Sequence, residues 1–248
     1  MTDSRVRFSF ALLLAAACAP PAANVVPRLG LTPPAAPGLD TIVYRRVVTR
    51  AGQDSAAGTR TVELRRLDGE RPLLEVVQRF PGGGGTIVDT ALADLRTLRA
   101  EAHSSHQPAR TMRFSFEGSF ANGSVATRDS VTPVHQGLGG PIFDSNIIEL
   151  VVAALPLQRG FKAELPFFIY ERGGRVPMEV TVRDRATEQF ALGPREAWVV
   201  GVAVPGAPAT VWVDTRTRAV LRVRYDVSAR GMSFTDERAT VLPPPRHG

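Results

Sequence analysis

Apolar and polar residues alternate strictly along several stretches of this chain. In RTMRFSFEG (110–118), Met112, Phe114 and Phe116 fall on one face, and mainly charged or hydroxyl-bearing residues fall on the other. RVPMEVTVRD (175–184) and RAVLRVRYDV (218–227) repeat the scheme. Side chains of a β-strand point alternately to the two faces of a sheet. The period of two therefore predicts antiparallel strands with one face in a core and one in water.

Segments rich in glycine, proline and polar residues separate the alternating runs, at 68–72, 81–85, 117–123, 173–175, 205–208 and 214–218. Strands at this spacing, with no second composition regime and no convincing repeat, predict one domain over residues 40–243. We expect a mainly β fold, in which a single curved antiparallel sheet (a β half-barrel) wraps around one apolar helix. Residues 244–248 are expected to form a short tail.

The helix is predicted over 144–155, within FDSNIIELVVAALPL (143–157). Asp144 or Ser145 can cap its first turn, and the Leu155-Pro156 step supplies a stop. Its apolar residues extend almost all round the helix, so it must be buried. We expect it on the concave side of the sheet, although it could serve there as core and nothing more.

The N-terminus has the pattern of an export signal. Arg5 and Arg7 precede an apolar run from Phe8 to Ala17, which leads through small residues into Cys18, the only cysteine. The run is too short to cross a bilayer as a helix. We expect residues 1–17 to be a signal peptide and Cys18 to be lipidated, followed by a proline- and alanine-rich tether over 18–39. The alternative is plain secretion, with cleavage nearby and no role for Cys18.

Charge gives little support to a nucleic-acid partner. The formal net charge is +6, and the isoelectric point is about 10.5. However, the arginines are scattered at alternating strand positions and form no basic cluster, so we expect no nucleic-acid binding. With one cysteine the chain cannot form an internal disulfide.

Residues that could carry chemistry are few. His103 and His106 have the spacing of two zinc ligands, but a site needs a third ligand, and we read this segment as a solvated loop. His135 could be joined on paper with Asp129 and Ser130 into a triad, although closeness in sequence is poor evidence for triad geometry. The glycines at 82–85 lack the residues of a phosphate-binding loop, and Asn122-Gly123 is read as a turn. We therefore expect no enzyme activity, no metal and no cofactor.

The stretch ATVWVDTRTRAVLRVRYD (209–226) resembles the late hairpin of bacterial β half-barrel proteins. This superfamily includes the periplasmic lipoprotein carrier and its outer-membrane lipoprotein receptor (LolA/LolB-like), an anti-sigma-factor partner (RseB-like) and uncharacterised exported domains. DTALADLRTLRAEAHSSH (89–106) is similar to a strand pair of those uncharacterised members. The resemblance implies a half-barrel whose concave face holds acyl chains.

Two functions follow as hypotheses. The first is a binding or carrier module, held by its lipid anchor at the outer membrane facing the periplasm, that takes an acyl chain, lipid or lipopeptide. The second is a structural or assembly lipoprotein of the cell envelope, which docks a protein partner and takes no small ligand. The residues expected to line the ligand groove are Ile147, Leu150, Val151, Ala154, Phe114, Phe116 and Trp212.

Overall fold

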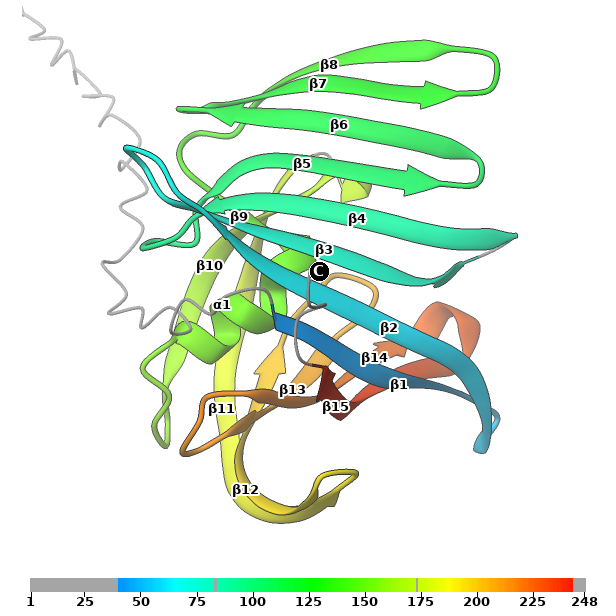
Figure 1. Ribbon diagram of the computed structural model, residues 1–248, viewed down its shortest axis with the longest axis vertical. Coiled ribbons are helices and arrows are strands. Elements are labelled where there is room, and N and C mark those ends of the chain that lie inside the picture. Colours follow the sequence, from blue (N-terminus) through cyan, green and yellow to red (C-terminus); the bar gives the residue numbers. More distant parts are fainter. Residues whose placement is uncertain (1–39, 83, 173, 243–248) are drawn as a thin grey trace, which may run out of the picture.

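One antiparallel sheet of 15 strands forms almost the whole described fold (Figure 1). The computed structural model describes residues 40–82, 84–172 and 174–242. The predicted export signal, Cys18, the tether and the 244–248 tail lie outside these residues. The strand order is β8-β7-β6-β5-β4-β3-β2-β1-β15-β14-β13-β12-β11-β10-β9. Strands consecutive in the chain therefore pair with each other, except β8 and β9, which form the two edges, and the first and last strands, β1 and β15, pair in the middle of the sheet.

The first eight strands are β1 (Asp40–Arg50), β2 (Gln53–Leu67), β3 (Leu73–Gly82), β4 (Gly85–Asp94), β5 (Ala100–Gln107), β6 (Arg110–Glu117), β7 (Phe120–Thr127) and β8 (Val131–Gly137). The remaining strands are β9 (Phe143–Asp144), β10 (Lys162–Ile169), β11 (Gly174–Phe190), β12 (Gly193–Val202), β13 (Ala209–Asp214), β14 (Val220–Val227) and β15 (Met232–Leu242). The helical segments are η1 (Ser145–Ile147), α1 (Ile148–Ala154), η2 (Tyr170–Arg172) and η3 (Ser228–Arg230). The mainly β prediction is confirmed.

Alternation correctly predicts which face is buried in β6 and β11. Met112, Phe114 and Phe116 of β6 are buried, whereas Arg113 and Glu117 are exposed. In β14 the alternation places Leu221, Val223 and Tyr225 on the inner face, which is right for Val223 and Tyr225 but wrong at the start of the strand. The pairing shifts between Trp212 and Val213, and such an irregularity reverses the face of the residues on one side of it. As a result Val220 belongs to the main core, and Leu221 packs in a separate cluster outside it.

The sheet curls so that its β9 edge reaches strands β4 and β5. The short strand β9 pairs with β10 in parallel, and the loop before β9 reaches the start of β5, where the Ala100 amide donates to the Ile142 carbonyl over 3.0 Å. Phe168 of β10 packs edge-on against Phe114 and Phe116 of β6, with ring centroids 5.2 and 4.9 Å apart. Phe167, the preceding residue, belongs to the main core. Strand β10 therefore separates two apolar compartments inside the curled sheet.

The predicted helix is present but shorter than expected. Residues 145–147 form a 3₁₀ turn, and the α-helix covers only Ile148–Ala154. The Asp144 side chain accepts from the Asn146 amide at 2.8 Å and caps the first turn. At the other end Arg218 donates to the Ala153 and Leu155 carbonyls, as basic side chains commonly do at the C-terminus of a helix. The helix lies between the two halves of the sheet (Figure 1), and within the described residues no helix is long and apolar enough to cross a membrane.

Three segments that were predicted to be loops or turns are strands in the structure. His103 and His106 lie on β5, and His135 lies on β8. Asn122-Gly123 lies within β7 and is not a turn. A Cβ atom on Gly123 would lie 1.9 Å from the Arg113 carbonyl oxygen on β6, so the glycine is needed for the close approach of the two strands.

Candidate functional site

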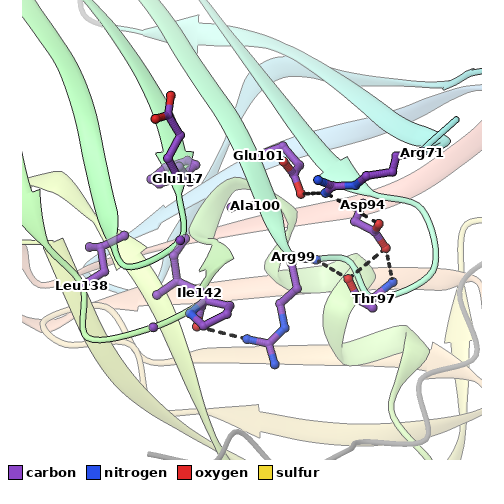
Figure 2. A pocket seen from close by; sticks show the side chains of 13 residues that line it. Arg71, Asp94, Thr97, Arg99, Ala100, Glu101, Glu117, Leu138 and Ile142 are labelled. Carbon is purple, nitrogen blue, oxygen red and sulfur yellow. Dashed lines mark hydrogen bonds and ion pairs between the residues drawn. The ribbon is translucent and has the colours of Figure 1, made fainter. Parts of the chain in front are cut away.

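A pocket of about 380 Å³ opens at one end of the curled sheet (Figure 2). Three chain reversals form it: the β4–β5 turn at 94–99, the β6–β7 turn at 118–119 and the β8–β9 loop at 138–142. Its lining is apolar where it meets the apolar compartment that contains Phe114, Phe116 and Phe168, and it is charged at the opening. The apolar floor consists of Ala100, Phe116, Leu138 and Ile142, and the charged side chains are Arg71, Asp94, Arg99, Glu101 and Glu117.

The β4–β5 turn owes its shape to Asp94. Its Oδ1 atom accepts from the Arg96 amide (3.0 Å), the Thr97 amide (2.8 Å) and the Thr97 hydroxyl (2.9 Å). Burial acts to raise the pKa of Asp94, but these hydrogen bonds outweigh it and hold the pKa below its usual value. Leu98, fully buried at φ +55°, completes the turn. The turn thereby fixes where Arg99 enters the pocket.

The same turn occurs a second time, between β13 and β14. Asp214 Oδ1 accepts from the Arg216 and Thr217 amides at 2.9 and 2.8 Å, and Arg218 takes the positive φ (+63°) that Leu98 takes in the first turn. The sequences DLRTLR (94–99) and DTRTRA (214–219) share the aspartate, arginine and threonine at equal spacing. The same local turn motif therefore closes both hairpins.

Some charged side chains at the opening of the pocket form ion pairs with one another, and Arg99 does not. Arg71 forms an ion pair with Glu101 and lies 4.0 Å from Asp94. The side chains of Glu117 and Arg99 point in opposite directions in Figure 2. Arg99 donates from Nη1 to the Pro141 carbonyl at 3.0 Å, and its guanidinium stacks 4.8 Å above the Phe143 ring. In the described part of the chain Arg99 has no carboxylate partner.

The seven residues expected to line one groove lie in three places. Ile147, Val151 and Ala154 of the helical segment are fully packed in the main core, and Leu150 is half-buried against it. Phe114 and Phe116 belong to the second compartment, and only Phe116 of the seven lines the pocket.

Trp212 lies on the opposite face of β13 from the core. Its indole N–H donates to Glu188 at 2.8 Å, and the Arg222 guanidinium lies 5.4 Å from its ring. Trp198 of β12 is the tryptophan that packs against the main core. Trp198, Val200 and Val202 occupy every second position of the strand, and this spacing predicts that Trp198 shares the core-facing side with the two buried valines.

A buried charged cluster inside the sheet escaped the sequence reasoning. Arg60 of β2 forms ion pairs with Glu149 of α1 and, at 3.2 Å, with Asp236 of β15. Arg46 donates two hydrogen bonds, of 2.7 and 2.8 Å, to the same Asp236 carboxylate. Gln78 accepts from Arg60 at 3.1 Å and donates to the Asn146 carbonyl. The cluster therefore ties the helical segment to strands β1, β2, β3 and β15.

The electrostatics of this cluster are set by burial and pairing. Burial alone would lower the pKa of Arg60, but Glu149 and Asp236 outweigh it and raise the pKa, so the guanidinium stays charged. The Tyr44 ring lies 4.6 Å beneath that guanidinium, and burial raises the pKa of Tyr44 to about 12. Both groups keep their usual protonation state at neutral pH, which suits a structural role.

The three histidines of the described residues each contact a different partner. His103 Nδ1 lies 2.9 Å from Asp144 Oδ2. His106 instead contacts the Thr111 hydroxyl at 3.1 Å, and His135 contacts Asn122 at 2.6 Å. No group of three potential ligands that could hold a metal occurs within residues 40–82, 84–172 and 174–242. What the His103–Asp144 pair does is join β5 to the start of the helical segment.

The fold and the pocket define a class: barrel-like all-β proteins in which an open sheet curls around one buried helix. The chain belongs to the family described as "Protein of unknown function (DUF3108)", whose model matches residues 43–235. No curated protein matches the chain.

Among solved structures, the chain is similar to a beta-barrel-like protein of the domain of unknown function DUF1849 from Brucella abortus. Identity is 11%, the match covers 83% of this chain and 97% of that one, and the TM-score is 0.51. A putative exported protein with a YmcC-like fold from Bacteroides fragilis matches over 87% of this chain and all of that one, with 9% identity and a TM-score of 0.31. The first likeness supports the fold.

Proposed function

We propose that this protein is an exported binding or carrier module, anchored to the outer membrane through a lipid on Cys18, that takes a hydrophobic or amphiphilic ligand. The observation that carries the proposal is the pocket of about 380 Å³, with its apolar floor and charged opening. Small-molecule sites are concave, mostly apolar and supplied with a few polar groups that orient the ligand. The pocket has this character.

The size of the pocket limits the ligand. Its volume lies near the lower end of the range of roughly 300–1,000 Å³ for ligand sites. One acyl chain segment or a comparable apolar group suits it better than a lipid with several chains. The main core around α1 is filled by its own side chains, so we place the ligand at the pocket and not beside Ile147, Val151 and Ala154.

Native mass spectrometry of protein purified gently from membranes of its source organism tests the proposal. We expect a non-covalent adduct with the mass of a lipid or fatty acid. Phe116→Glu, which puts a charge on the apolar floor, should lose the adduct. Phe120→Glu is the matched control, because Phe120 is 45% exposed and lies outside the pocket. Bare wild-type protein, or equal adducts on all three proteins, would contradict the proposal.

A docking function is the second candidate, and the edge strand β8 is the observation that favours it. Among the described strands β8 pairs only with β7, and Val131 at its start is 68% exposed. An open edge can pair with a strand of another protein. Mild crosslinking in cells tests this candidate: one envelope partner should be recovered through β8, and Val131→Lys should abolish the crosslink. If only monomer is recovered, this candidate is wrong.

A further inference from the structure

Two arginines hold the two ends of the loop that borders the pocket. Arg99 donates to the Pro141 carbonyl, and Arg175 of β11 donates from Nη1 to the Leu138 carbonyl, each over 3.0 Å. Between these anchoring points lie Gly139 and Gly140, at φ +66° and +142°. Cβ atoms placed on the two glycines would lie 3.8 and 3.7 Å from Arg175 Nη1. The two guanidinium groups are therefore held beside one short loop.

Neither guanidinium has a carboxylate partner among the residues that the structure describes, and both side chains are half-buried. Burial lowers the pKa of Arg99, and the positive charge of Arg175 lowers it further. Two partly desolvated like charges repel each other more than they would in water. An anion bound beside Arg99 would offset this cost.

The geometry of Arg99 suits an oxyanion. Nη1 is engaged by the Pro141 carbonyl, and the ring of Phe143 supports one face of the guanidinium plane. Among the residues that the structure describes, no hydrogen bond or ion pair engages Nε or Nη2, so the edge that these two atoms form is free for a ligand. That edge presents two parallel N–H groups, which match the spacing of two oxygens of a carboxylate or phosphate.

The other charges of the rim do not cancel this preference. Asp94 is held by the amides and hydroxyl of its own turn, and Glu101 is paired with Arg71. Glu117 and Arg99 point in opposite directions in Figure 2, so the Glu117 carboxylate does not face the Arg99 guanidinium. An anionic head group can approach Arg99 while the apolar floor remains available to the chain attached to it.

We propose that Arg99, supported by Arg175 at the same loop, binds the oxyanion head group of an amphiphile whose apolar chain lies on Phe116 and Ile142. This inference rests on the proposed function and names its ligand class: a carboxylate or phosphate joined to a single apolar chain. The source could be a fatty acid or a phospholipid head group, which share this chemistry. The experiment distinguishes the two.

The test is isothermal titration of the folded protein with three probes of equal chain length: decanoate, decyl phosphate and decanol. We expect both anions to bind more tightly than decanol by about tenfold or more, since hydrogen bonds to charged groups are the stronger ones. Tighter binding of decanoate would assign a fatty acid, and tighter binding of decyl phosphate would assign a phosphorylated lipid.

Arg99→Gln should reduce the affinity for both anions by about tenfold or more and leave decanol binding unchanged. Arg99→Lys, which keeps the charge but loses the two-pronged edge, should fall between the two. Arg96→Gln is the matched control, because Arg96 is an exposed arginine of the same turn that does not line the pocket, and it should behave as wild type. A change in net charge alone would affect both variants equally.

A failure of the proposed function and a failure of the head-group assignment give different results. If none of the three probes binds, the proposed function is wrong. If decanol binds as tightly as decanoate and decyl phosphate, or if Arg96→Gln loses as much affinity as Arg99→Gln, the pocket takes apolar chains and the head-group assignment is overturned.

Discussion

Arg60 on β2 and Glu149 on α1 form an ion pair inside the curled sheet, with side chains only 4% and 7% exposed. The pair joins residues 89 positions apart in the sequence, the difference between 149 and 60. Asp236, Arg46 and Gln78 extend it into a network across four strands and the helix. This network, together with the apolar core, fixes α1 in place between the strands.

Breaking the buried pair should be costly. Arg60→Met leaves the Glu149 carboxylate buried without its partner, and we expect a loss of about 3–5 kcal/mol in the free energy of unfolding, measured by urea denaturation. Arg66→Met is the control, since Arg66 and its partner Asp68 are 47% and 81% exposed. Exposed pairs contribute about 0–1 kcal/mol. Equal losses in the two variants would show that the buried pair does not hold the helix.

The His103–Asp144 pair predicts a pH dependence of stability. Burial lowers the pKa of His103, but the charge and hydrogen bond of Asp144 outweigh it and raise the pKa above the ordinary 6.5. A raised histidine pKa stabilises the fold fully below pH 6.5, and the contribution is lost as pH rises through the folded-state value. His103→Gln should flatten this loss in melting experiments between pH 5.5 and about 8.5, whereas His106→Gln should not.

Asp89 predicts a gain of stability on neutralisation. Burial raises the pKa of Asp89, against the opposing hydrogen bond from Ser105, and its Oδ1 has no hydrogen-bond partner in the described part of the chain. The ionised carboxylate therefore costs stability above its ordinary pKa of 3.8. Asp89→Asn should be more stable than wild type at pH 7, with the difference vanishing below that value. A less stable variant at pH 7 would show that ionised Asp89 has a favourable partner.

Gly123 predicts a steric effect that hydropathy does not reveal. Because a Cβ would lie 1.9 Å from the Arg113 carbonyl oxygen, Gly123→Ala must push β6 and β7 apart. We expect a loss of about 1–3 kcal/mol in unfolding free energy. Gly137→Ala on β8 is the control, since its Cβ would meet nothing within 4 Å. Tolerance of Gly123→Ala equal to that of Gly137→Ala would contradict the close approach of the strands.

The lipid anchor is tested by the mass of the mature protein. We expect the purified polypeptide to begin at Cys18 and to carry covalent acyl groups, and Cys18→Ser to leave the membrane fraction. The same charged, apolar and small-residue pattern is also compatible with plain secretion. A mature N-terminus elsewhere without acyl mass would establish that alternative.

Local patterns predicted much of the fold. Alternation marks β6 and β11 because each of these strands has one wet face, and the capping and stop residues place the helical segment within a few positions. The failures arise where pairing is not local. The irregularity between Trp212 and Val213 reverses the face expected for Leu221. Phe167 and Phe168 are both buried, because β10 lies inside the curled sheet with a compartment on each side.

The pocket could not be predicted from the sequence, because it too depends on contacts between residues far apart in the chain. Its walls come from three reversals, and only the curl of the sheet brings residues near Asp94, Phe116 and Ile142 together. Phe116 was found because it is an apolar residue on the inward face of a predicted strand. Arg99 gave no such signal, since an arginine in a polar turn looks like any other solvated charge. The Arg60–Glu149 pair was missed likewise, because a charge on a strand predicts exposure.

Photocrosslinking with a diazirine-bearing fatty acid tests the central claim most directly, because it shows where an apolar chain lies. The probe is incubated with the folded protein, irradiated, and mapped to residues by fragmentation mass spectrometry. The account predicts label on Phe116 and in 138–142, competed by unlabelled decanoate and reduced in Arg99→Gln. Label spread over the outer face of the sheet, or confined to α1 with the pocket unlabelled, would contradict it.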